Sequence, residues 1–214
     1  MIQSCDALML TLGFEPGPLV RATASHNLRL GGSIIVFTSG FKDDRAERAY
    51  LEFKKICDMI YKDAMINIEK VEVDLTDFLK AVRRVKEILS KFVDKRVAFC
   101  FSGGMRALCL VILIAYLTLK WRYKPIIEVH FEGRAECLAI PPINEVVRIN
   151  ISKEKKSILQ LLFKHGSLSA GNIAVLMQKD RSTIYRHLTS LLESGLIRQK
   201  GRMYELTDLG FVLI

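Results

Sequence analysis

A glycine turn in the middle of the chain holds the residue types best suited to binding an anion. It reads Ser102-Gly103-Gly104-Met105-Arg106 and lies between the apolar runs 97–100 and 107–119, which predicts a strand, a turn and the start of a helix. Two glycines let the backbone turn without a clashing Cβ and leave N–H groups free to face an anion at the positive end of the helix. Arg106 adds a permanent, planar positive charge that suits phosphate. A plain strand-to-helix turn with a solvated arginine is the competing interpretation.

Two other turns follow apolar runs in the same way. Leu12-Gly13-Phe14 comes after the run 7–10, and Thr38-Ser39-Gly40 comes after the run 34–37. In open parallel sheets, ligands bind beyond the carboxyl ends of the strands, where the strand order reverses. If the first and fourth strands are neighbours, as in the common doubly wound order, Gly13-Phe14 and the turn at 102–106 would flank that crevice together, and the 38–40 turn would lie at the carboxyl end of its own strand. The candidate ligand-binding residues are Leu12, Gly13, Phe14, Thr38, Ser39, Gly40, Ser102, Gly103, Gly104, Met105 and Arg106.

The elements that must position these turns alternate between strand and helix. Strands are predicted near 7–10, 34–37, 66–73 and 97–100, with helices at 16–30 (ended by Gly31-Gly32), 46–60, 74–92 and 107–119, and a hairpin within 126–140. Four strand-then-helix units predict an α/β fold with a mostly parallel sheet covered on both faces and closed at one edge by the hairpin.

Composition narrows the class of partner. The 214 residues carry a net charge of +9, and residues 151–214 hold ten Lys/Arg against five Asp/Glu, so the last third is the most basic part and a polyanionic partner is expected. The five cysteines are far apart and mostly apolar in context, which argues against a disulfide framework, a paired-cysteine metal site and a metal-sensing repressor. The chain shows no basic-then-apolar leader, and its most apolar segment, 108–119, is too short to span a bilayer, so a cytoplasmic protein without membrane contact is expected.

From residue 151 the pattern changes to three short helices, at 155–164, 169–177 and 181–193, followed by a hairpin at 196–206 with a basic tip. This order resembles the winged helix-turn-helix DNA-binding fold. The third helix leaves polar and basic side chains on its outer face, which suits a major groove, and the hairpin tip could meet phosphate. The competing interpretation is a winged helix used only for protein contacts. The candidate DNA-binding residues are Arg181, Ser182, Thr183, Tyr185, Arg186, Lys200 and Arg202.

Taken together, these motifs resemble archaeal CRISPR-associated transcription regulators that carry a CRISPR-associated Rossmann-fold (CARF) sensor domain. The resemblance rests on the turn at 11–14, the turn at 102–106 before an apolar helix, a Glu132-Gly133-Arg134 loop late in the sheet, and the C-terminal winged helix. It adds Glu132, Gly133 and Arg134 to the candidate ligand-binding residues. The chain departs from many members at Phe101, where they have an acidic residue.

The resemblance implies a Rossmann-like sensor domain at 1–150 and a small winged helix-turn-helix domain at 151–214. It implies a homodimer whose two sensor domains share one pocket across a twofold axis, with a cyclic oligoadenylate, foremost cyclic tetraadenylate, as ligand. The expected function is a ligand-responsive regulator that binds double-stranded DNA and controls CRISPR-type defence genes, with no cofactor, metal or catalytic residue.

Two enzymatic alternatives stay open. The Ser102-Gly103-Gly104 turn resembles the pyrophosphate loop of ATP pyrophosphatases, but that loop usually follows the first strand and continues with Asp-Ser. A sensor of this fold could also cleave its cyclic ligand slowly through Ser102 and Arg106. These turns contain no histidine or lysine that would serve as a general acid.

Overall fold

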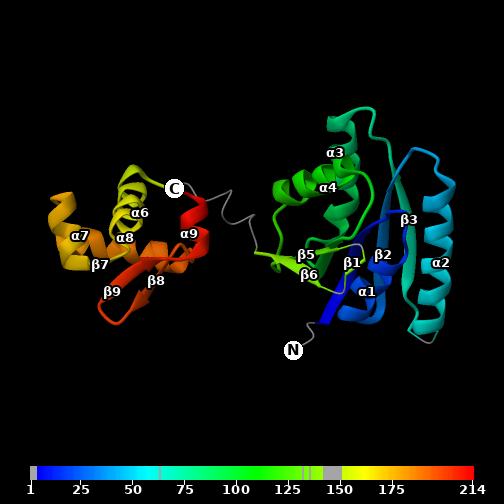
Figure 1. The fold of residues 1–214 in the computed structure, drawn as a ribbon, viewed down its shortest axis with the longest axis horizontal. Coiled ribbons are helices and arrows are strands. Elements are labelled where there is room, and N and C mark those ends of the chain that lie inside the picture. The colour runs from blue at the N-terminus through cyan, green and yellow to red at the C-terminus, as the bar shows by residue number, and fades with distance from the viewer. Residues whose placement is uncertain (1–3, 63, 132, 135, 142–150) are drawn as a thin grey trace. The chain divides into compact units, whose positions relative to one another are not determined.

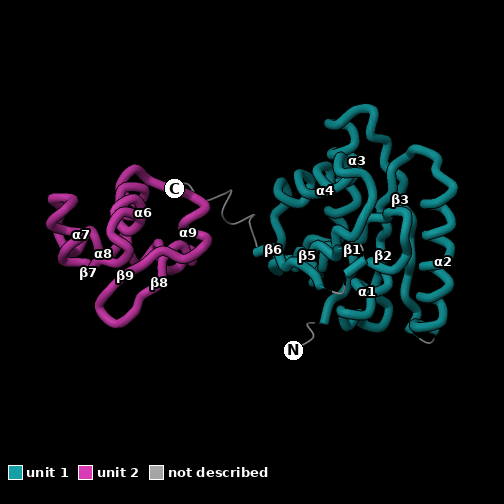
Figure 2. Tube along the Cα trace, in the orientation of Figure 1, with its two compact units in different colours: residues 1–143 teal, residues 144–214 magenta. Residues whose placement is uncertain are grey.

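The computed structural model describes residues 4–62, 64–131, 133, 134, 136–141 and 151–214. The chain divides into two compact units, Met1–Ile143 and Asn144–Ile214 (Figure 2). Among the described residues, no helix combines the length and the apolar composition that crossing a membrane requires.

The first unit alternates strands and helices along the chain (Figure 1). Its elements are β1 (Ser4–Thr11), α1 (Gly17–Ser25), β2 (Asn27–Ser39), α2 (Asp44–Ile60), β3 (Asn67–Val73), α3 (Phe78–Leu89), the short 3-10 helix η1 (Ser90–Phe92), β4 (Val97–Phe101), α4 (Arg106–Thr118), β5 (Ile126–His130) and β6 (Cys137–Ile140). Local signals set several boundaries: the Asp77 carboxylate accepts a hydrogen bond from the backbone N–H of Lys80 and so caps α3.

The six strands form one sheet in the order β3-β2-β1-β4-β5-β6. The first five strands are parallel, and β6 runs antiparallel to β5. The predicted mostly parallel sheet, the edge hairpin and the adjacency of the first and fourth strands are therefore confirmed. The strand order reverses between β1 and β4, so the crevice expected of this class of sheet lies beyond their carboxyl ends.

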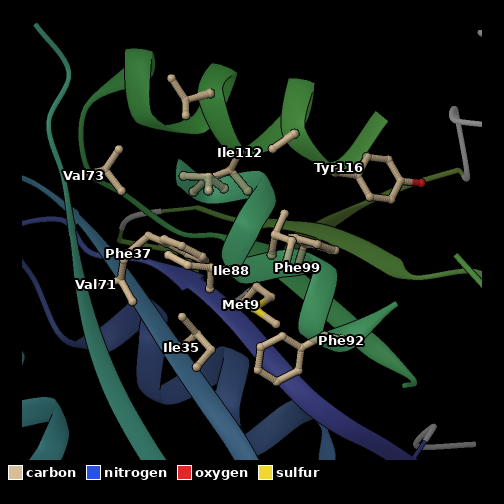
Figure 3. Packing of buried hydrophobic residues seen from close by; sticks show 14 of the residues in the cluster. Met9, Ile35, Phe37, Val71, Val73, Ile88, Phe92, Phe99, Ile112 and Tyr116 are labelled. Carbon is tan, nitrogen blue, oxygen red and sulfur yellow. The ribbon is translucent and has the colours of Figure 1, made fainter. Parts of the chain in front are cut away.

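The central strand β1 is buried on both faces. Its Ala7 and Met9 pack with residues of α3 and α4, while Leu8 and Leu10 pack with residues of α1 and α2. Figure 3 shows the first of these cores, in which rings such as Phe37 and Phe99 lie around Met9. Fully buried parallel strands require apolar residues on both faces, which explains the continuous apolar runs in the sequence.

One predicted boundary is wrong. Helix α1 ends at Ser25, and Gly31-Gly32 lie inside β2 instead of ending a helix. The pairing of β2 with β1 is irregular here, because the register shifts between Cys5 and Ala7. Gly31 has a φ of +69°, and a Cβ on Gly32 would lie 2.8 Å from the carbonyl oxygen of Arg29. The glycine pair therefore lies at an irregularity in a strand. Glycine is favoured both there and at the ends of helices, so the sequence alone allows either interpretation.

The second unit contains three helices and a small antiparallel sheet. Its elements are α6 (Lys153–His165), β7 (Ser167–Ser169), α7 (Ala170–Met177), α8 (Arg181–Glu193), β8 (Ile197–Lys200), β9 (Met203–Leu206) and α9 (Asp208–Val212). The sheet order is β7-β9-β8. The three predicted helices and the hairpin are confirmed. Strand β7 and the short helix α9 were not predicted, and the Phe211 ring of α9 packs edge to face on Phe163.

Candidate functional site

The turn at 102–106 packs directly on the residue that follows β1. Gly104 has a φ of +86°, and a Cβ at this position would lie 2.5 Å from the carbonyl oxygen of Leu12. Glycine is thus required for two reasons, the left-handed backbone and the close approach of two chain segments. This contact fixes the separation of the two turns at the point where the strand order reverses.

Replacing Gly104 with alanine should therefore destabilise the first unit more than a positive φ alone would. Gly31 has a similar φ of +69°, and a Cβ added there would meet no atom within 4 Å, so Gly31→Ala is the matched control. A left-handed backbone costs a non-glycine residue about 1–3 kcal/mol, and Gly104→Ala adds the clash with Leu12. Denaturant unfolding should place the midpoint of Gly104→Ala clearly below that of Gly31→Ala. Equal midpoints would show that the contact with Leu12 relaxes without cost.

The backbone N–H groups of this turn are not all free, which corrects the expectation from the sequence. The N–H groups of Ser102 and Gly103 both donate to the Thr11 hydroxyl, at 3.1 and 3.4 Å. Ser102 itself is 3% exposed, and its hydroxyl donates to the carbonyl of Cys100 at 3.4 Å. Thr11 therefore joins the ends of β1 and β4. The Ser102 hydroxyl is committed to the protein interior, a poor arrangement for a nucleophile.

Backbone donors remain at the start of α4. Its N-cap residue Met105 supplies no side-chain hydrogen bond, and Arg106 is exposed at the first helical position. The N-terminal turn of a helix has N–H groups without intrahelical partners and carries a partial positive charge. The anion-binding potential of the turn thus lies at 105–106 and not at its first two residues.

A pocket of about 390 Å³ opens beside this helix start. It is lined by seven of the predicted residues, namely Leu12, Gly13, Phe14, Thr38, Ser39, Gly104 and Met105, together with Phe41, Lys42, Asp43 and Ala46. Gly40 lines an adjoining pocket that shares Leu12, Thr38 and Ser39 with this one. The turns after β1, β2 and β4 therefore meet around one cavity, as the strand order requires.

The cation that lines this cavity, and a second one beside it, were not predicted from the sequence. Lys42 lines the pocket, and the Arg45 guanidinium stacks 4.0 Å from the centre of the Phe14 ring, which is itself 54% exposed. Arg45 also pairs with Asp43, and hydrogen bonds from its side chain and its backbone N–H lower the pKa of the Asp43 carboxyl. Their position in the sequence could have identified them, because Lys42 and Arg45 directly follow the 38–40 turn, at the start of the next helix.

The remaining predicted residues lie elsewhere. Ser102, Gly103 and Arg106 line a second, mostly apolar groove formed with Leu110, Leu113, Val129, Phe131 and Ile140. Gly133 and Arg134 are exposed and line neither cavity. Glu132 lies outside the described residues. The 102–106 turn is thus shared between two surfaces, with Met105 facing the pocket and Arg106 facing the groove.

In the second unit, the predicted DNA-facing residues are exposed or half-buried along α8 and the hairpin. Arg181, Ser182, Tyr185 and Arg186 are exposed and Thr183 is half-buried, while Ile184 and Leu188 of the same helix are buried. Arg202 is exposed at the hairpin tip. Lys200 is paired with Glu205 at 2.8 Å, and Arg198 binds the same carboxylate. The hydrogen bonds from Lys200 and Arg198 lower the pKa of Glu205. Any anion outside the chain must therefore compete with the Glu205 carboxylate for these two cations.

Comparisons with known proteins address each unit separately. Residues 6–141 match a family described as the Csa3 CRISPR-associated Rossmann-like domain, and residues 145–213 match the N-terminal domain of the methanogenesis regulatory protein FilR1. A relative from Saccharolobus solfataricus, named "CRISPR locus-related putative DNA-binding protein Csa3", is 24% identical over 148 residues. That alignment covers 67% of this chain and 61% of the relative, so the chain spans less than two thirds of that protein.

A solved structure of Can2 from Sulfobacillus thermosulfidooxidans in complex with cyclic tetra-adenylate is also similar. It aligns over 97% of this chain and 61% of its own chain, with a TM-score of 0.43 and 13% identity, which is too distant to bear on function. The family match covers much more of the site, since it begins within β1 and runs through the β5-β6 hairpin, so that it includes every turn around the pocket. The chain therefore belongs to the Csa3 family of CRISPR-associated proteins with a Rossmann-like domain.

Proposed function

We propose that this chain is a ligand-responsive, DNA-binding transcriptional regulator of CRISPR-type defence genes. In this proposal residues 1–150 sense a cyclic oligoadenylate, with cyclic tetraadenylate as the expected ligand, and residues 151–214 form a winged helix-turn-helix domain. The observation that carries it is one chain with a pocket at the reversal point of a parallel sheet and a second unit that presents a polar, basic helix. Membership of the Csa3 family supports the CRISPR context.

The pocket has the chemistry that a nucleotide phosphate requires. The start of α4 offers backbone N–H groups, Lys42 offers positive charge, and the exposed Phe14 ring offers a surface on which a base can stack. Arg45 lies over the same ring, but it is paired with the Asp43 carboxylate, which also lines the pocket. At about 390 Å³ the pocket is small for a ligand with four nucleotides. A ligand of that size would need two such pockets joined, which favours a site shared by two copies of the chain.

An exposed apolar surface beside the turn supports a homodimer. On α4, Leu110 and Ile114 are 55% and 39% exposed, and on neighbouring segments Phe131 and Leu138 are 41% and 53% exposed. Apolar side chains gathered in this way mark interaction surfaces. Because Arg106 and Leu110 line the same groove, a twofold interface here would bring the two 102–106 turns, and with them the two pockets, close together.

The second unit fits duplex DNA better than a purely structural role. Helix α8 buries one face and leaves Arg181, Tyr185 and Arg186 exposed on the other, as a helix that enters a major groove must. The hairpin carries Arg198, Lys200 and Arg202 close together in sequence, where they could meet phosphate. Similarity to the FilR1 N-terminal domain supports a regulatory role for this unit.

A thermal-shift experiment tests the ligand. Cyclic tetraadenylate at 100 Kd should raise the melting temperature of the first unit by about 9 °C, because that concentration stabilises a folded state by about 2.7 kcal/mol and a unit of this size unfolds with an entropy of about 0.3 kcal/mol/K. Lys42→Ala removes a charge that lines the pocket and should reduce the shift. Arg106→Ala should also reduce it, because Arg106 lines the groove where the second copy of the chain is proposed to join the two pockets. Lys54→Ala, which removes an exposed α2 charge outside the three described cavities, should leave it unchanged.

The same experiment separates the alternatives. A shift with ATP and none with any cyclic oligoadenylate would favour the pyrophosphatase-like enzyme and contradict the sensor. A shift only with a ring of another size would keep the sensor and change the ligand. Incubation of the complex followed by chromatography of the nucleotide would detect slow cleavage of the ring.

A further inference from the structure

Five potential metal ligands that are far apart in the sequence meet on one face of the first sheet. They are His26 after α1, Cys100 in β4, Glu128 and His130 in β5, and Cys137 in β6. Their ligand atoms form two groups of three that share Glu128, and within each group the atoms lie within 4.8 Å of one another. The proposed ligand pocket and the proposed DNA surface use none of these side chains, while His130 also lines the apolar groove that contains Leu110 and Phe131.

Strand pairing builds this cluster. Cys100 pairs with Glu128 across β4 and β5, and His130 pairs with Cys137 across β5 and β6. Glu128 and His130 are two positions apart on one strand, so they project from the same face. His26 reaches this face from the end of α1, and its Nε2 lies 3.1 Å from Glu128 Oε2.

The two groups differ in how readily they could hold an ion. In the inner group, Cys100 is fully buried, and burial together with the charge of Glu128 raises the pKa of its thiol well above the ordinary value. Its sulfur lies 3.7 Å from His26 Nε2, and that imidazole already faces Glu128. In the outer group, Cys137 is exposed, and His130 Nε2 lies 3.0 Å from Glu128 Oε2. Cys137 places one ligand of the outer group at the surface, the Glu128 side chain is 17% exposed, and His130 is buried, so the outer group lies closer to solvent than the inner one.

The donor set and its spacing suit a transition metal. Imidazole, thiolate and carboxylate are the usual ligands of zinc, which binds them at about 2.0–2.3 Å, so that tetrahedral ligands stand about 3.3–3.8 Å apart. The outer group already gathers one donor of each kind, held by a paired hairpin. Three protein ligands leave a fourth position open to solvent or to another group.

We infer that Glu128, His130 and Cys137 bind one divalent transition-metal ion of the zinc class. His26 acts as a positioning residue, because its imidazole hydrogen-bonds Glu128 and fixes the carboxylate that ligates the ion. The ion ties β5 to β6 on the face of the sheet that α1 covers. This metal site does not depend on the proposed function.

Metal titration with matched cysteine variants tests this assignment. Purified, metal-free chain should take up one equivalent of Zn²⁺, and Co²⁺ in its place should give a thiolate-to-cobalt charge-transfer band together with the strong visible absorption of tetrahedral cobalt. Cys137→Ser should abolish the charge-transfer band. Cys100→Ser, which removes the buried cysteine of the same cluster, should retain the band. His26→Gln should weaken zinc affinity about 10- to 100-fold while keeping the stoichiometry.

Two results would overturn the inference. The first is the absence of stoichiometric binding at micromolar Zn²⁺ and Co²⁺, which would leave Glu128 as a carboxylate hydrogen-bonded by two imidazoles. The second is a charge-transfer band that survives Cys137→Ser or is lost in Cys100→Ser. Because Cys137 is exposed, its substitution should not disturb folding, and circular dichroism of each variant checks this. Binding of cyclic tetraadenylate, measured separately, reports on the proposed function alone.

Discussion

Arg186→Ala is expected to remove sequence-specific DNA binding while leaving the chain folded and its oligomeric state unchanged. The side chain is exposed in the middle of α8, one turn after the helix start, where a recognition helix reads base edges. A bidentate arginine contact to a base contributes about 1–3 kcal/mol of discrimination, and a twofold dimer loses it at both half-sites, about 30- to 10⁴-fold in total. The measurement is a binding titration on a duplex that the wild-type chain selects from a random library.

Two further variants separate the contact made by Arg186 from the effect of overall charge on DNA affinity. Lys164→Ala removes one exposed positive charge from α6 and should change affinity only through general electrostatics. Glu205→Gln should act in the opposite direction, because it releases Lys200 and Arg198 from their shared carboxylate and so strengthens binding at low salt. Arg186→Ala with wild-type affinity at moderate salt would contradict the DNA-binding assignment of α8.

Leu110→Asp combined with Ile114→Asp is expected to convert the proposed homodimer into monomers. Both side chains are exposed on α4 in the chain by itself, so the substitutions should not disturb the fold, yet each would place an unpaired carboxylate in a twofold apolar interface. Several kcal/mol per buried charge should raise the dimer dissociation constant at least about a thousandfold. Light scattering coupled to size-exclusion chromatography across a concentration series gives the molecular mass directly.

The dimer experiment also reports on the shared pocket. The monomeric variant should lose most of its affinity for cyclic tetraadenylate, because each chain would hold only half of the ligand. Met59→Asp is the matched control, since Met59 is an apolar residue of α2 that is 80% exposed and lies in neither described cavity. A double variant that stays dimeric would move the interface elsewhere. A wild-type chain that is monomeric at micromolar concentration would contradict the homodimer itself.

The sequence was a good guide wherever a local pattern has one structural meaning. Apolar runs followed by glycine turns identified β1, β2 and β4 and the turns after them, and the usual order of such strands placed the first beside the fourth. The pattern failed at Gly31-Gly32, because a glycine pair serves equally as a helix stop and as an irregularity in a strand. Only the pairing of β2 with β1 distinguishes the two.

The site was less predictable, because side-chain direction depends on pairing. The residues of the 102–106 turn were expected to face one ligand, yet Ser102 turns inward and Arg106 faces a separate groove. The group formed by Glu128, His130 and Cys137 was not predicted either, because strand pairing brings these residues together. The cysteines are far apart in the sequence, which argued against a paired-cysteine metal site. Only the registers of β4, β5 and β6 bring two of them to the same carboxylate.

The hydroxyl of Thr11 has a consequence for how the chain folds. Its partner Ser102 lies 91 positions later, so the centre of the sheet closes only after most of the first unit has been synthesised. Long-range parallel pairing is slow, because the entropy of loop closure is lost before the contacts form. The second unit, whose hairpin and helices are neighbours in sequence, has no such delay. Refolding should therefore show a fast phase from the second unit and a slower one that ends when β4 docks on β1.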